Sequence, residues 1–276
     1  MTIGIFGHGV VGSAQAAVLK HSKQFYYIHD PDLGCRIVQD TNGRFVGIDI
    51  AFICLPAPTF QNGLVDSSII YETLEHLEDG ATAIIRSTIP PGTTDMLEVC
   101  FSKLNLFFVP EFLSESTNIH DAMNPSRVII GYSNKFAKQL ETFLMGGDYP
   151  SHIVNPARYM SPCRELLWMP ARDAEAAKYA ANAFYANKVA IMNQFHDAFT
   201  AMGCNWDNIH AAIQADRWTG SQHTDINHKG YRGYAGHCLR KDTNALIAAA
   251  AAVDTPLTIL EASASYNEAL LKSQNK

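Results

Sequence analysis

The chain has 276 residues, more than one ordinary domain usually contains and enough for two. Hydrophobic residues make up 47% of it and charged residues 17%, a balance that favours a buried core and argues against extensive disorder. The formal net charge of -6, with no cluster of Lys and Arg, argues against nucleic acid or an anionic membrane surface as a partner.

From Thr2 to about Val154, short apolar runs alternate with amphipathic stretches, which is the pattern of βαβ units. Stretches such as 10–20 and 67–78 carry apolar residues at helical spacing. The fold class is therefore α/β, with a doubly wound, mostly parallel sheet in a first domain over residues 1–160. The expected strands are residues 3–6, 25–28, 48–55, 83–86, 106–109 and 127–130.

Residues 161–276 are expected to form an all-helical second domain. After Pro170 the chain runs to Met202 without Gly or Pro, which predicts one helix of roughly 30 residues, about 45 Å long. Such a helix is longer than a small domain is wide, so we expect it to pack against its copy in a homodimer. Further helices are expected at 205–215, at 241–252 and from Thr255 onward, the last with Pro256 in its first turn.

The six cysteines are scattered without a repeated C-x-x-C, which favours neither disulfide bonds nor a zinc site. No apolar run approaches the roughly 20 residues that span a bilayer, and no basic region precedes the first strand. We therefore expect a cytoplasmic protein. No metal is expected, and four histidines are interpreted as loop or substrate contacts: His210, His223, His228 and His237.

A G-x-G-x-x-G motif follows the first expected strand and opens the first helix, the context in which this motif binds a dinucleotide on a Rossmann domain. Asp30 lies 18 residues beyond the motif, where a carboxylate can bind both ribose hydroxyls and repel a 2'-phosphate. NAD is thus favoured over NADP. The alternatives are a structural turn whose Asp caps the next loop, or FAD. The expected cofactor contacts of the motif are Gly7, Gly9, Val10, Val11 and Gly12.

A polar segment from Arg217 to Cys238 is rich in Gly and His, and irregular segments of this length are usually functional. Five motifs occur in order along the chain: FICLPAPT at 52–59, STIPPGTTD at 87–95, PEFLSES at 110–116, EAAKYAANAF at 175–184 and GYAGHCLRKD at 233–242. Together they resemble the UDP-glucose/GDP-mannose dehydrogenase family over nearly the whole chain.

The resemblance implies oxidation of a primary alcohol on a nucleotide-linked sugar, such as UDP-glucose, to a carboxylate with two NAD consumed. Cys238 matches the family's nucleophile. Its thiolate would attack the intermediate aldehyde, and oxidation of the thiohemiacetal would leave a thioester that water hydrolyses. Lys241 would favour the thiolate and face the cofactor phosphates. The resemblance also implies a role in capsule or cell-surface polysaccharide biosynthesis.

The resemblance also implies further catalytic roles. Lys178 and Asn182 are spaced i, i+4 on one helix face and match donors that stabilise the oxyanions of both oxidations. Glu111 matches the carboxylate that activates water for thioester hydrolysis. Asp242 would join the proton relay of the first oxidation, or it could cap the helix that follows. Thr88 would contact the nicotinamide side or an ordered water.

Other residues of the motifs are expected to bind cofactor or substrate. Pro56 matches a cofactor contact, and Glu115 would lie on the nicotinamide side, unless it is a surface carboxylate in a loop. The substrate contacts implied by the resemblance are Glu111, Lys178, Asn182, Arg217, Tyr234 and Gly236.

The sequence departs from the family's pattern in several places. Family members usually continue into a third, Rossmann-like domain that holds the nucleotide, whereas this sequence ends at Lys276. The substrate would then be bound by a dimer, by a third domain on a separate chain, or would be smaller. His237 replaces a small residue, Ala57 replaces a Thr, and Leu239 and Arg240 replace Phe-Pro. Arg240 could bind a substrate phosphate.

Two other functions remain open from the sequence. One is a two-electron, NAD-dependent dehydrogenase of a smaller hydroxy substrate, which would share the Rossmann domain, the long helix and a catalytic Lys but needs no nucleophilic Cys. The other is a catalytically inactive nucleotide-binding subunit. In such a subunit the motifs should have decayed, and here Cys238, Lys178, Asn182, Glu111 and Asp242 are all present.

Overall fold

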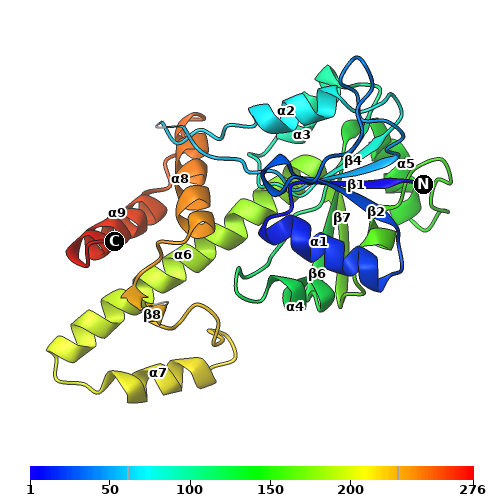
Figure 1. Ribbon diagram of the computed structural model, residues 1–276. Coiled ribbons are helices and arrows are strands. Elements are labelled where there is room, and N and C mark those ends of the chain that lie inside the picture. The colour runs from blue at the N-terminus through cyan, green and yellow to red at the C-terminus, as the bar shows by residue number, and fades with distance from the viewer. Residues whose placement is uncertain (61, 229) are drawn as a thin grey trace. The chain divides into compact units, whose positions relative to one another are not determined.

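A computed structural model describes residues 1–60, 62–228 and 230–276 (Figure 1). The side chains of His228 and His237, expected to be loop or substrate contacts, lie outside what it describes. The chain divides into two compact units. Unit 1 comprises Met1–Pro58 with Val65–Lys178, and unit 2 comprises Thr59–Leu64 with Tyr179–Lys276.

Unit 1 contains a seven-stranded sheet in the order β2-β1-β3-β4-β5-β6-β7. Its neighbouring strands are parallel except β5 and β6. This topology confirms the predicted α/β fold with its mostly parallel, Rossmann-type sheet. The strands are β1 (Ile3–Phe6), β2 (Tyr26–His29), β3 (Ile50–Ile53), β4 (Thr82–Ile85), β5 (Asn105–Phe108), β6 (Arg127–Tyr132) and β7 (Glu165–Pro170).

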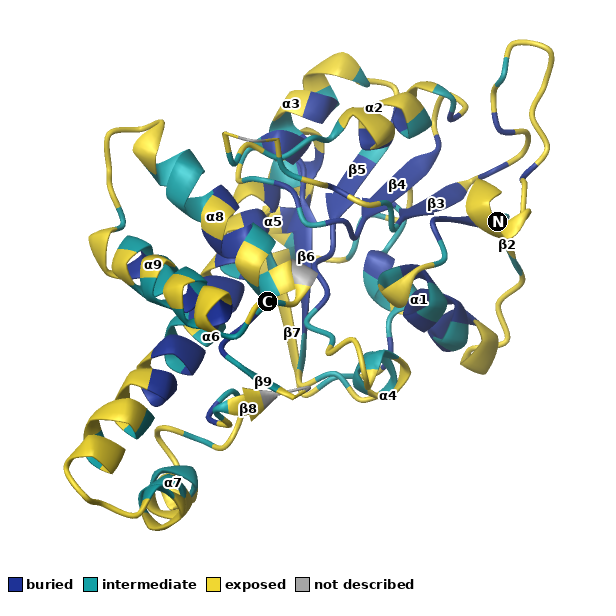
Figure 2. Ribbon diagram, turned by 60° about the vertical axis from the view of Figure 1, so that its left-hand side comes forward, coloured by how far each residue is buried: buried dark blue, intermediate teal, exposed yellow. Residues whose placement is uncertain are grey.

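Helices cover both faces of this sheet. Successive side chains of a strand point to opposite faces, so each inner strand contributes to two core clusters. In β3, Ala51 and Ile53 pack in one core cluster with residues of α2 and α3, whereas Ile50 and Phe52 pack in another with α1 and α5. Figure 2 shows β3, β4 and β5 as almost entirely buried. The helices of unit 1 are α1 (Val10–His21), α2 (Ser68–Glu75), α3 (Thr93–Cys100), α4 (Asn118–Met123) and α5 (Ala137–Leu144).

β7 is not among the predicted strands. Its sequence, Glu165–Pro170, follows a polar stretch and immediately precedes the long helix. It pairs with β6 only, at the edge of the sheet, so most of its side chains stay exposed or half-exposed. Residues 166–169 are apolar but lie directly before Pro170 and the long helix, and periodicity alone does not distinguish so short an apolar run from part of a helix.

The long helix is α6 (Ala171–Ala201), with 31 residues and a length of about 45 Å. Its bounds agree closely with the predicted stretch. Residues up to Lys178 belong to unit 1 and the later residues to unit 2. Over the described ranges, no helix combines the length and the hydrophobicity that crossing a membrane would require.

The rest of unit 2 consists of helices and one short hairpin. Tyr234 packs with Ala186, Val189 and Ala190 of α6 in the core of this unit. Two predicted boundaries were wrong: α8 starts four residues before Lys241, and Pro256 precedes α9 instead of lying in its first turn. The elements are α7 (Trp206–Ala215), β8 (Asn227–His228), β9 (Tyr231–Arg232), α8 (His237–Ala251) and α9 (Thr258–Ser273).

Candidate active site

The glycine motif forms a tight turn between β1 and α1. Gly7 has φ +84°, and a Cβ on it would lie 2.6 Å from the carbonyl oxygen of Cys54. A Cβ on Gly12 would lie 1.9 Å from the carbonyl oxygen of Gly7, so both positions require glycine. Gly9 faces open space, with no atom of the described chain within 4 Å of the Cβ position. The turn thus leaves its outer side accessible to a ligand.

The amino terminus of α1 can hold a phosphate. Its N-cap residue is Gly9, which supplies no side-chain cap. The backbone N–H groups of Val10 and Val11 in the first turn therefore remain available to an anion, and the helix dipole favours negative charge there. These features fit the pyrophosphate of a dinucleotide.

Asp30 follows β2 and has two structural partners. Its Oδ2 accepts a hydrogen bond of 2.7 Å from the backbone N–H of His8, in the glycine turn. Its Oδ1 accepts a weaker one of 3.3 Å from the N–H of Leu33 and caps a short 3₁₀ helix. The side chain is half-exposed, so the capping role and contact with a ribose are compatible. Asp30 thereby joins the glycine turn to the end of β2.

Thr88 and Pro56 follow β4 and β3 at the same edge of the sheet as the glycine turn. The carboxyl ends of parallel strands meet at one edge, where ligands of such sheets bind. Ser87 joins the two strand ends, since its hydroxyl donates to the carbonyl oxygen of Leu55 over 2.7 Å. Pro56 is exposed and Thr88 is half-buried.

Glu111 and Lys178 form a buried ion pair in unit 1. Lys178 Nζ lies 2.8 Å from Glu111 Oε1 and also donates to the Glu111 carbonyl oxygen over 2.5 Å. The N–H of Leu113 donates to Glu111 Oε2 over 2.8 Å. Burial opposes ionisation of Glu111, but Lys178 and these hydrogen bonds outweigh it, so the pKa of the carboxyl lies below its ordinary value. Glu111 is therefore a carboxylate at neutral pH.

Glu175 fixes the start of α6, a role that the sequence did not reveal. Its buried carboxylate accepts hydrogen bonds from the N–H groups of Gly92 and Thr94, at 2.5 and 2.8 Å, and from the hydroxyl of Thr94. Burial raises the pKa of Glu175 to about 7 despite these bonds. Glu175 precedes Lys178 by three residues, so both lie on one face of α6 and the clamp holds Lys178 in place. The three-residue spacing between Glu175 and Lys178 was the signal in the sequence from which this role could have been inferred.

Asn182 and Asp242 form a buried pair in unit 2. Asn182 Nδ2 donates to Asp242 Oδ2 over 2.6 Å. Lys241 Nζ lies 2.8 Å from Asp242 Oδ1, an ion pair that lacks the alignment of a hydrogen bond. The interpretation of Asp242 as a helix cap was wrong, because α8 begins five residues earlier, at His237. Asp242 is instead an internal residue of α8 whose carboxylate contacts the side-chain amide of Asn182 and the ammonium of Lys241.

Cys238 lies in the first turn of α8 and is exposed. The N-cap residue, Gly236, is extended and supplies no side-chain cap, so the helix terminus favours an anion at this point. Lys241 and Asp242 follow Cys238 by three and four residues, on the same side of the helix. In contrast, burial raises the pKa of the Cys54 thiol to about 12, so that thiol stays protonated.

Tyr234 is buried and held by a residue that sequence reasoning missed. The backbone N–H and carbonyl oxygen of Tyr234 bind the side-chain amide of Asn267 in α9 at 2.8 and 3.0 Å. A Cβ on the preceding Gly233, which has φ +86°, would lie 2.6 Å from Asn267 Oδ1. This contact fixes the irregular segment that leads from β9 to Gly236 and Cys238. No local pattern in α9 distinguishes Asn267 from other polar residues.

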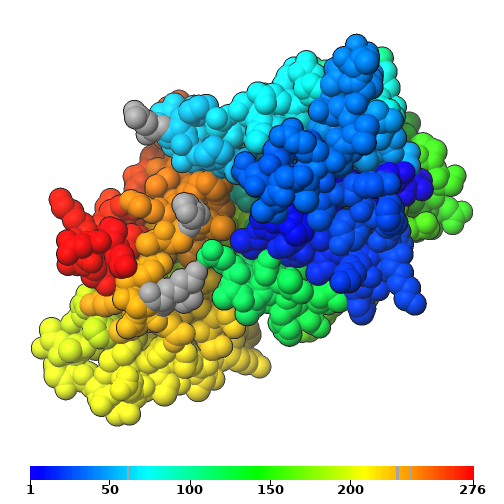
Figure 3. Space-filling view, in the orientation of Figure 1, coloured from blue at the N-terminus to red at the C-terminus, as the bar shows by residue number. Residues whose placement is uncertain are grey.

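The other expected contacts lie at the surface of their units. Arg217 follows α7, its guanidinium 4.4 Å from the ring centre of Trp218, itself 82% exposed. In the space-filling view the yellow part of the chain, which includes α7, forms part of the visible surface (Figure 3). Glu115 is exposed in the loop before α4. Arg240 donates from Nε to Glu268 Oε1 over 2.7 Å and from Nη2 to Glu268 Oε2, so binding a substrate phosphate would require that pair to open.

Comparison with known proteins identifies the family. Residues 34–144 match the NAD binding domain of the UDP-glucose/GDP-mannose dehydrogenase family, and residues 172–269 match its central domain. The chain belongs to this family. The first match includes Thr88 and Glu111, and the second includes Lys178, Asn182 and Cys238. NAD is the cofactor of the matched domain; the glycine turn precedes the matched range, and its assignment rests on the geometry given above.

Curated relatives align with this chain over about half of their own length. A UDP-glucose 6-dehydrogenase of Rhizobium meliloti is 31% identical over 80% of this chain and 50% of its own. UDP-glucose 6-dehydrogenase YwqF of Bacillus subtilis is 27% identical over 77% of this chain and 47% of its own. The chain thus spans about half the length of these dehydrogenases.

Solved structures share the fold. A UDP-glucose dehydrogenase from Pyrobaculum islandicum superposes with a TM-score of 0.74 at 22% identity, over 97% of this chain and 68% of that one. A UDP-D-ManNAc dehydrogenase from Pyrococcus horikoshii gives a TM-score of 0.72 at 20% identity, over 100% and 72% of the two chains. Family membership and fold therefore agree.

Proposed function

We propose that the chain catalyses the NAD-dependent, four-electron oxidation of the primary alcohol of a nucleotide sugar, UDP-glucose or a close analogue, to the uronic acid. The observation that carries this proposal is the position of Cys238, exposed in the first turn of α8 and one turn before the buried pair of Asp242 and Asn182. A two-electron dehydrogenase would have no use for a thiol there.

NAD, held by the glycine turn and Asp30, would supply the hydride acceptor for each of the two oxidations. The Cys238 thiolate would add to the carbon of the intermediate aldehyde, forming a C–S bond and leaving a thiohemiacetal oxyanion. After the second oxidation the same carbon is a thioester. Attack by water breaks the C–S bond, releases the carboxylate and returns the sulfur as thiolate.

The other residues of the motifs would act on charges and protons. Lys178 and Asn182, one helical turn apart in α6, would donate hydrogen bonds to the oxyanions of both oxidations. Asp242 would take up the proton of the alcohol, and the Glu111 carboxylate would position the water for thioester hydrolysis. Thr88 and Glu115 would lie on the nicotinamide side, and Lys241 would face the cofactor phosphates.

The stoichiometry of NADH formation tests this proposal. With UDP-glucose as first substrate in a panel of sugar nucleotides, we expect two NADH per substrate consumed, recorded by absorbance and matched to the uronic acid formed. One NADH per substrate, with an aldehyde or ketone as product, would instead identify a two-electron dehydrogenase. Tight NAD binding with no turnover of any sugar nucleotide or smaller alcohol would identify an inactive nucleotide-binding subunit.

We further propose that two copies associate through α6. Phe184, Ile191 and Phe195 are 67%, 41% and 40% exposed, and their spacing places them on one face of the helix. Beside Ile191, residues of α6 and α9 line a groove of about 340 Å³ that includes the 78% exposed Ile259. A long helix with such an apolar face is suited to a second copy of itself.

Ile191→Glu should convert the dimer to a monomer in sedimentation at micromolar concentration, because it places a charge in the apolar contact. Ala211→Glu, on the exposed side of α7, is the matched control and should leave the dimer intact. A wild-type chain that sediments as a monomer would refute the interface.

We also propose that the protein acts in the cytoplasm, where its six thiols stay reduced, and that its acid product serves polysaccharide biosynthesis.

A further inference from the structure

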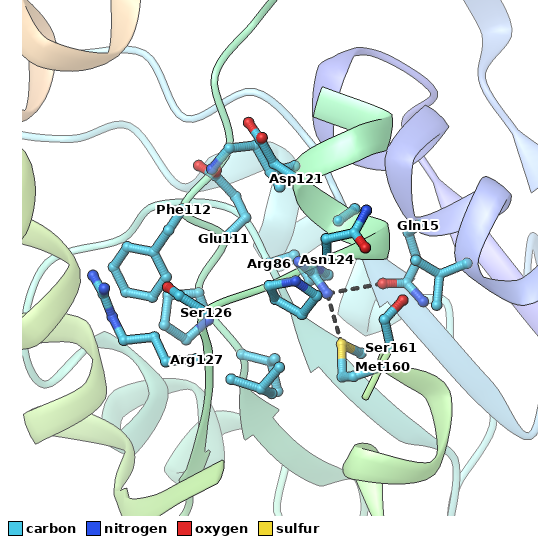
Figure 4. Close-up of a pocket in the computed structure, with 17 residues that line it drawn as sticks. Gln15, Arg86, Glu111, Phe112, Asp121, Asn124, Ser126, Arg127, Met160 and Ser161 are labelled. Carbon is cyan, nitrogen blue, oxygen red and sulfur yellow. Dashed lines mark hydrogen bonds between the residues drawn. The ribbon is translucent and has the colours of Figure 1, made fainter. Parts of the chain in front are cut away.

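We propose that unit 1 binds one small oxyanion, a carboxylate or a phosphate, on the buried guanidinium of Arg86. The site is a cavity of about 200 Å³ beside the carboxyl ends of β4 and β5 (Figure 4). Residues of α1, of the segment that links α4 to β6, and Met160 with Ser161 complete its wall. The glycine turn, residues 7–12, takes no part in the lining, so the cavity is separate from the proposed pyrophosphate site.

Arg86 is 8% exposed and only part of its hydrogen-bonding capacity is used. Nη1 donates to Gln15 Oε1 over 2.8 Å and contacts Met160 Sδ at 2.9 Å. Gln15 is itself anchored, since its Nε2 donates to the Tyr159 carbonyl oxygen over 2.9 Å. Among the described residues, the buried Nε of Arg86 has no hydrogen-bond partner. A buried donor without a partner is costly, so the protein alone leaves this guanidinium incompletely satisfied.

The charges around the cavity leave Arg86 without an anion of its own. Glu111 is already paired with Lys178 at 2.8 Å. Asp121, the other carboxylate in the lining, accepts hydrogen bonds from Ser114 N–H and the Thr117 hydroxyl at 2.9 and 2.8 Å. Burial lowers the pKa of Arg86, although Glu111 partly offsets this effect. A guanidinium nevertheless stays charged at neutral pH, so the cavity wall carries a buried cation for which the described residues supply no ion-pair partner.

The rest of the wall selects a small anion. Arg127 adds a second cation, with its guanidinium 4.0 Å from the ring centre of Phe112. Ser126 and Ser161 add hydroxyl groups that can donate to an oxyanion (Figure 4). A volume of about 200 Å³ lies below the range of cofactor pockets and admits a carboxylate or phosphate group. The fork of a guanidinium matches two oxygens of either group.

Thermal unfolding with inorganic phosphate or acetate tests the site without NAD or a sugar substrate, so its outcome does not depend on the proposed function. Ionic strength is held constant with a sulfonate too bulky for the cavity. We expect the melting temperature of the wild type to rise with at least one probe, because a ligand that binds only the folded state stabilises it. The part of a phosphate response that depends on Arg86 identifies a phosphate site in the cavity, as distinct from the amino terminus of α1, and the part of an acetate response that depends on Arg86 identifies a carboxylate site.

Arg86→Met keeps the length of the side chain and removes its charge, so it should abolish that response. Arg164→Met is the matched control, since Arg164 is 87% exposed outside the cavity, and it should respond as the wild type does. A wild type that responds to neither probe would overturn the proposal. So would an Arg86→Met variant that responds as strongly as the wild type.

A measurement on the wild type keeps the test valid if Arg86→Met does not fold. In protein labelled with ¹⁵N-arginine, the Nε–H resonance of Arg86 should shift during titration with phosphate or acetate, because an anion bound to the guanidinium changes the electronic environment of that N–H. The Arg164 resonance should not move. An Arg86 resonance that stays in place with both probes would exclude an anion at this guanidinium.

Discussion

Cys238→Ser should abolish formation of the uronic acid, with a loss of roughly 10⁴-fold or more in kcat. A serine hydroxyl stays protonated at neutral pH, so it adds to the aldehyde far more slowly than a thiolate. The first oxidation does not need the sulfur. NADH formation and acid formation should therefore separate: a trace of the first product can form, but the acid cannot. Chromatography of the products beside NADH absorbance checks both.

Cys204→Ser is the matched control for this variant. Cys204 is also an exposed cysteine of unit 2, but it follows α6 and lies in none of the five motifs. Its replacement should leave both products at wild-type rates. If Cys238→Ser formed acid at the wild-type rate, the thioester mechanism would be wrong and the two-electron alternative would gain support.

Lys178→Met should cost about 3–5 kcal/mol of the free energy of unfolding, because it leaves the Glu111 carboxylate buried without its partner. It should also lower kcat roughly 10²- to 10³-fold by removing a donor to the oxyanions. Chemical denaturation at neutral pH measures the first effect. Lys103→Met is the control, because its ion pair with Asp79 is exposed and screened by solvent, so its loss should change the free energy of unfolding little.

The pH dependence of stability distinguishes loss of this pair from general damage. In the wild type the pKa of Glu111 is lowered, so its contribution is present above the ordinary carboxyl value and is lost as the pH falls. In Lys178→Met burial dominates and raises that pKa, so the variant should approach wild-type stability on acidification. If Lys178→Met cost no more than Lys103→Met, or if the deficit did not depend on pH, the buried pair would not have the assigned importance.

The arrangement of unit 1 could be predicted from the sequence because its elements are local patterns. The inner strands are short apolar runs, and the observed β1, β4 and β5 differ from the predicted ranges by at most one residue at either end. The absence of Gly and Pro after Pro170 predicted α6 with similar success. The edge strand β7 was missed although residues 166–169 are apolar, because periodicity does not distinguish a short apolar run beside a helix from part of that helix.

The candidate site, like the fold, could be predicted from the sequence only in part. Helical spacing predicts that Lys178 and Asn182 share a face of α6, and the motifs name Glu111, Cys238 and Asp242. The resemblance alone does not say which side chains pair, because Glu111 is 67 residues from Lys178, and Asp242 is 60 residues from Asn182. Those partners follow from the packing of segments far apart in the chain, which no local periodicity records.

Three residues acquire their roles only in the folded chain. Glu175 and Asn267 are ordinary polar residues within helical sequences, yet each holds a distant turn by backbone hydrogen bonds. Arg86 reads as a charged residue at the end of a strand, and the structure buries it beside a cavity. Sequence by itself determined the strands, the long helix and the identity of the chemical groups, since these depend on neighbours in the chain. Tertiary structure decided which groups are buried and paired, because desolvation and pairing depend on segments far apart in sequence.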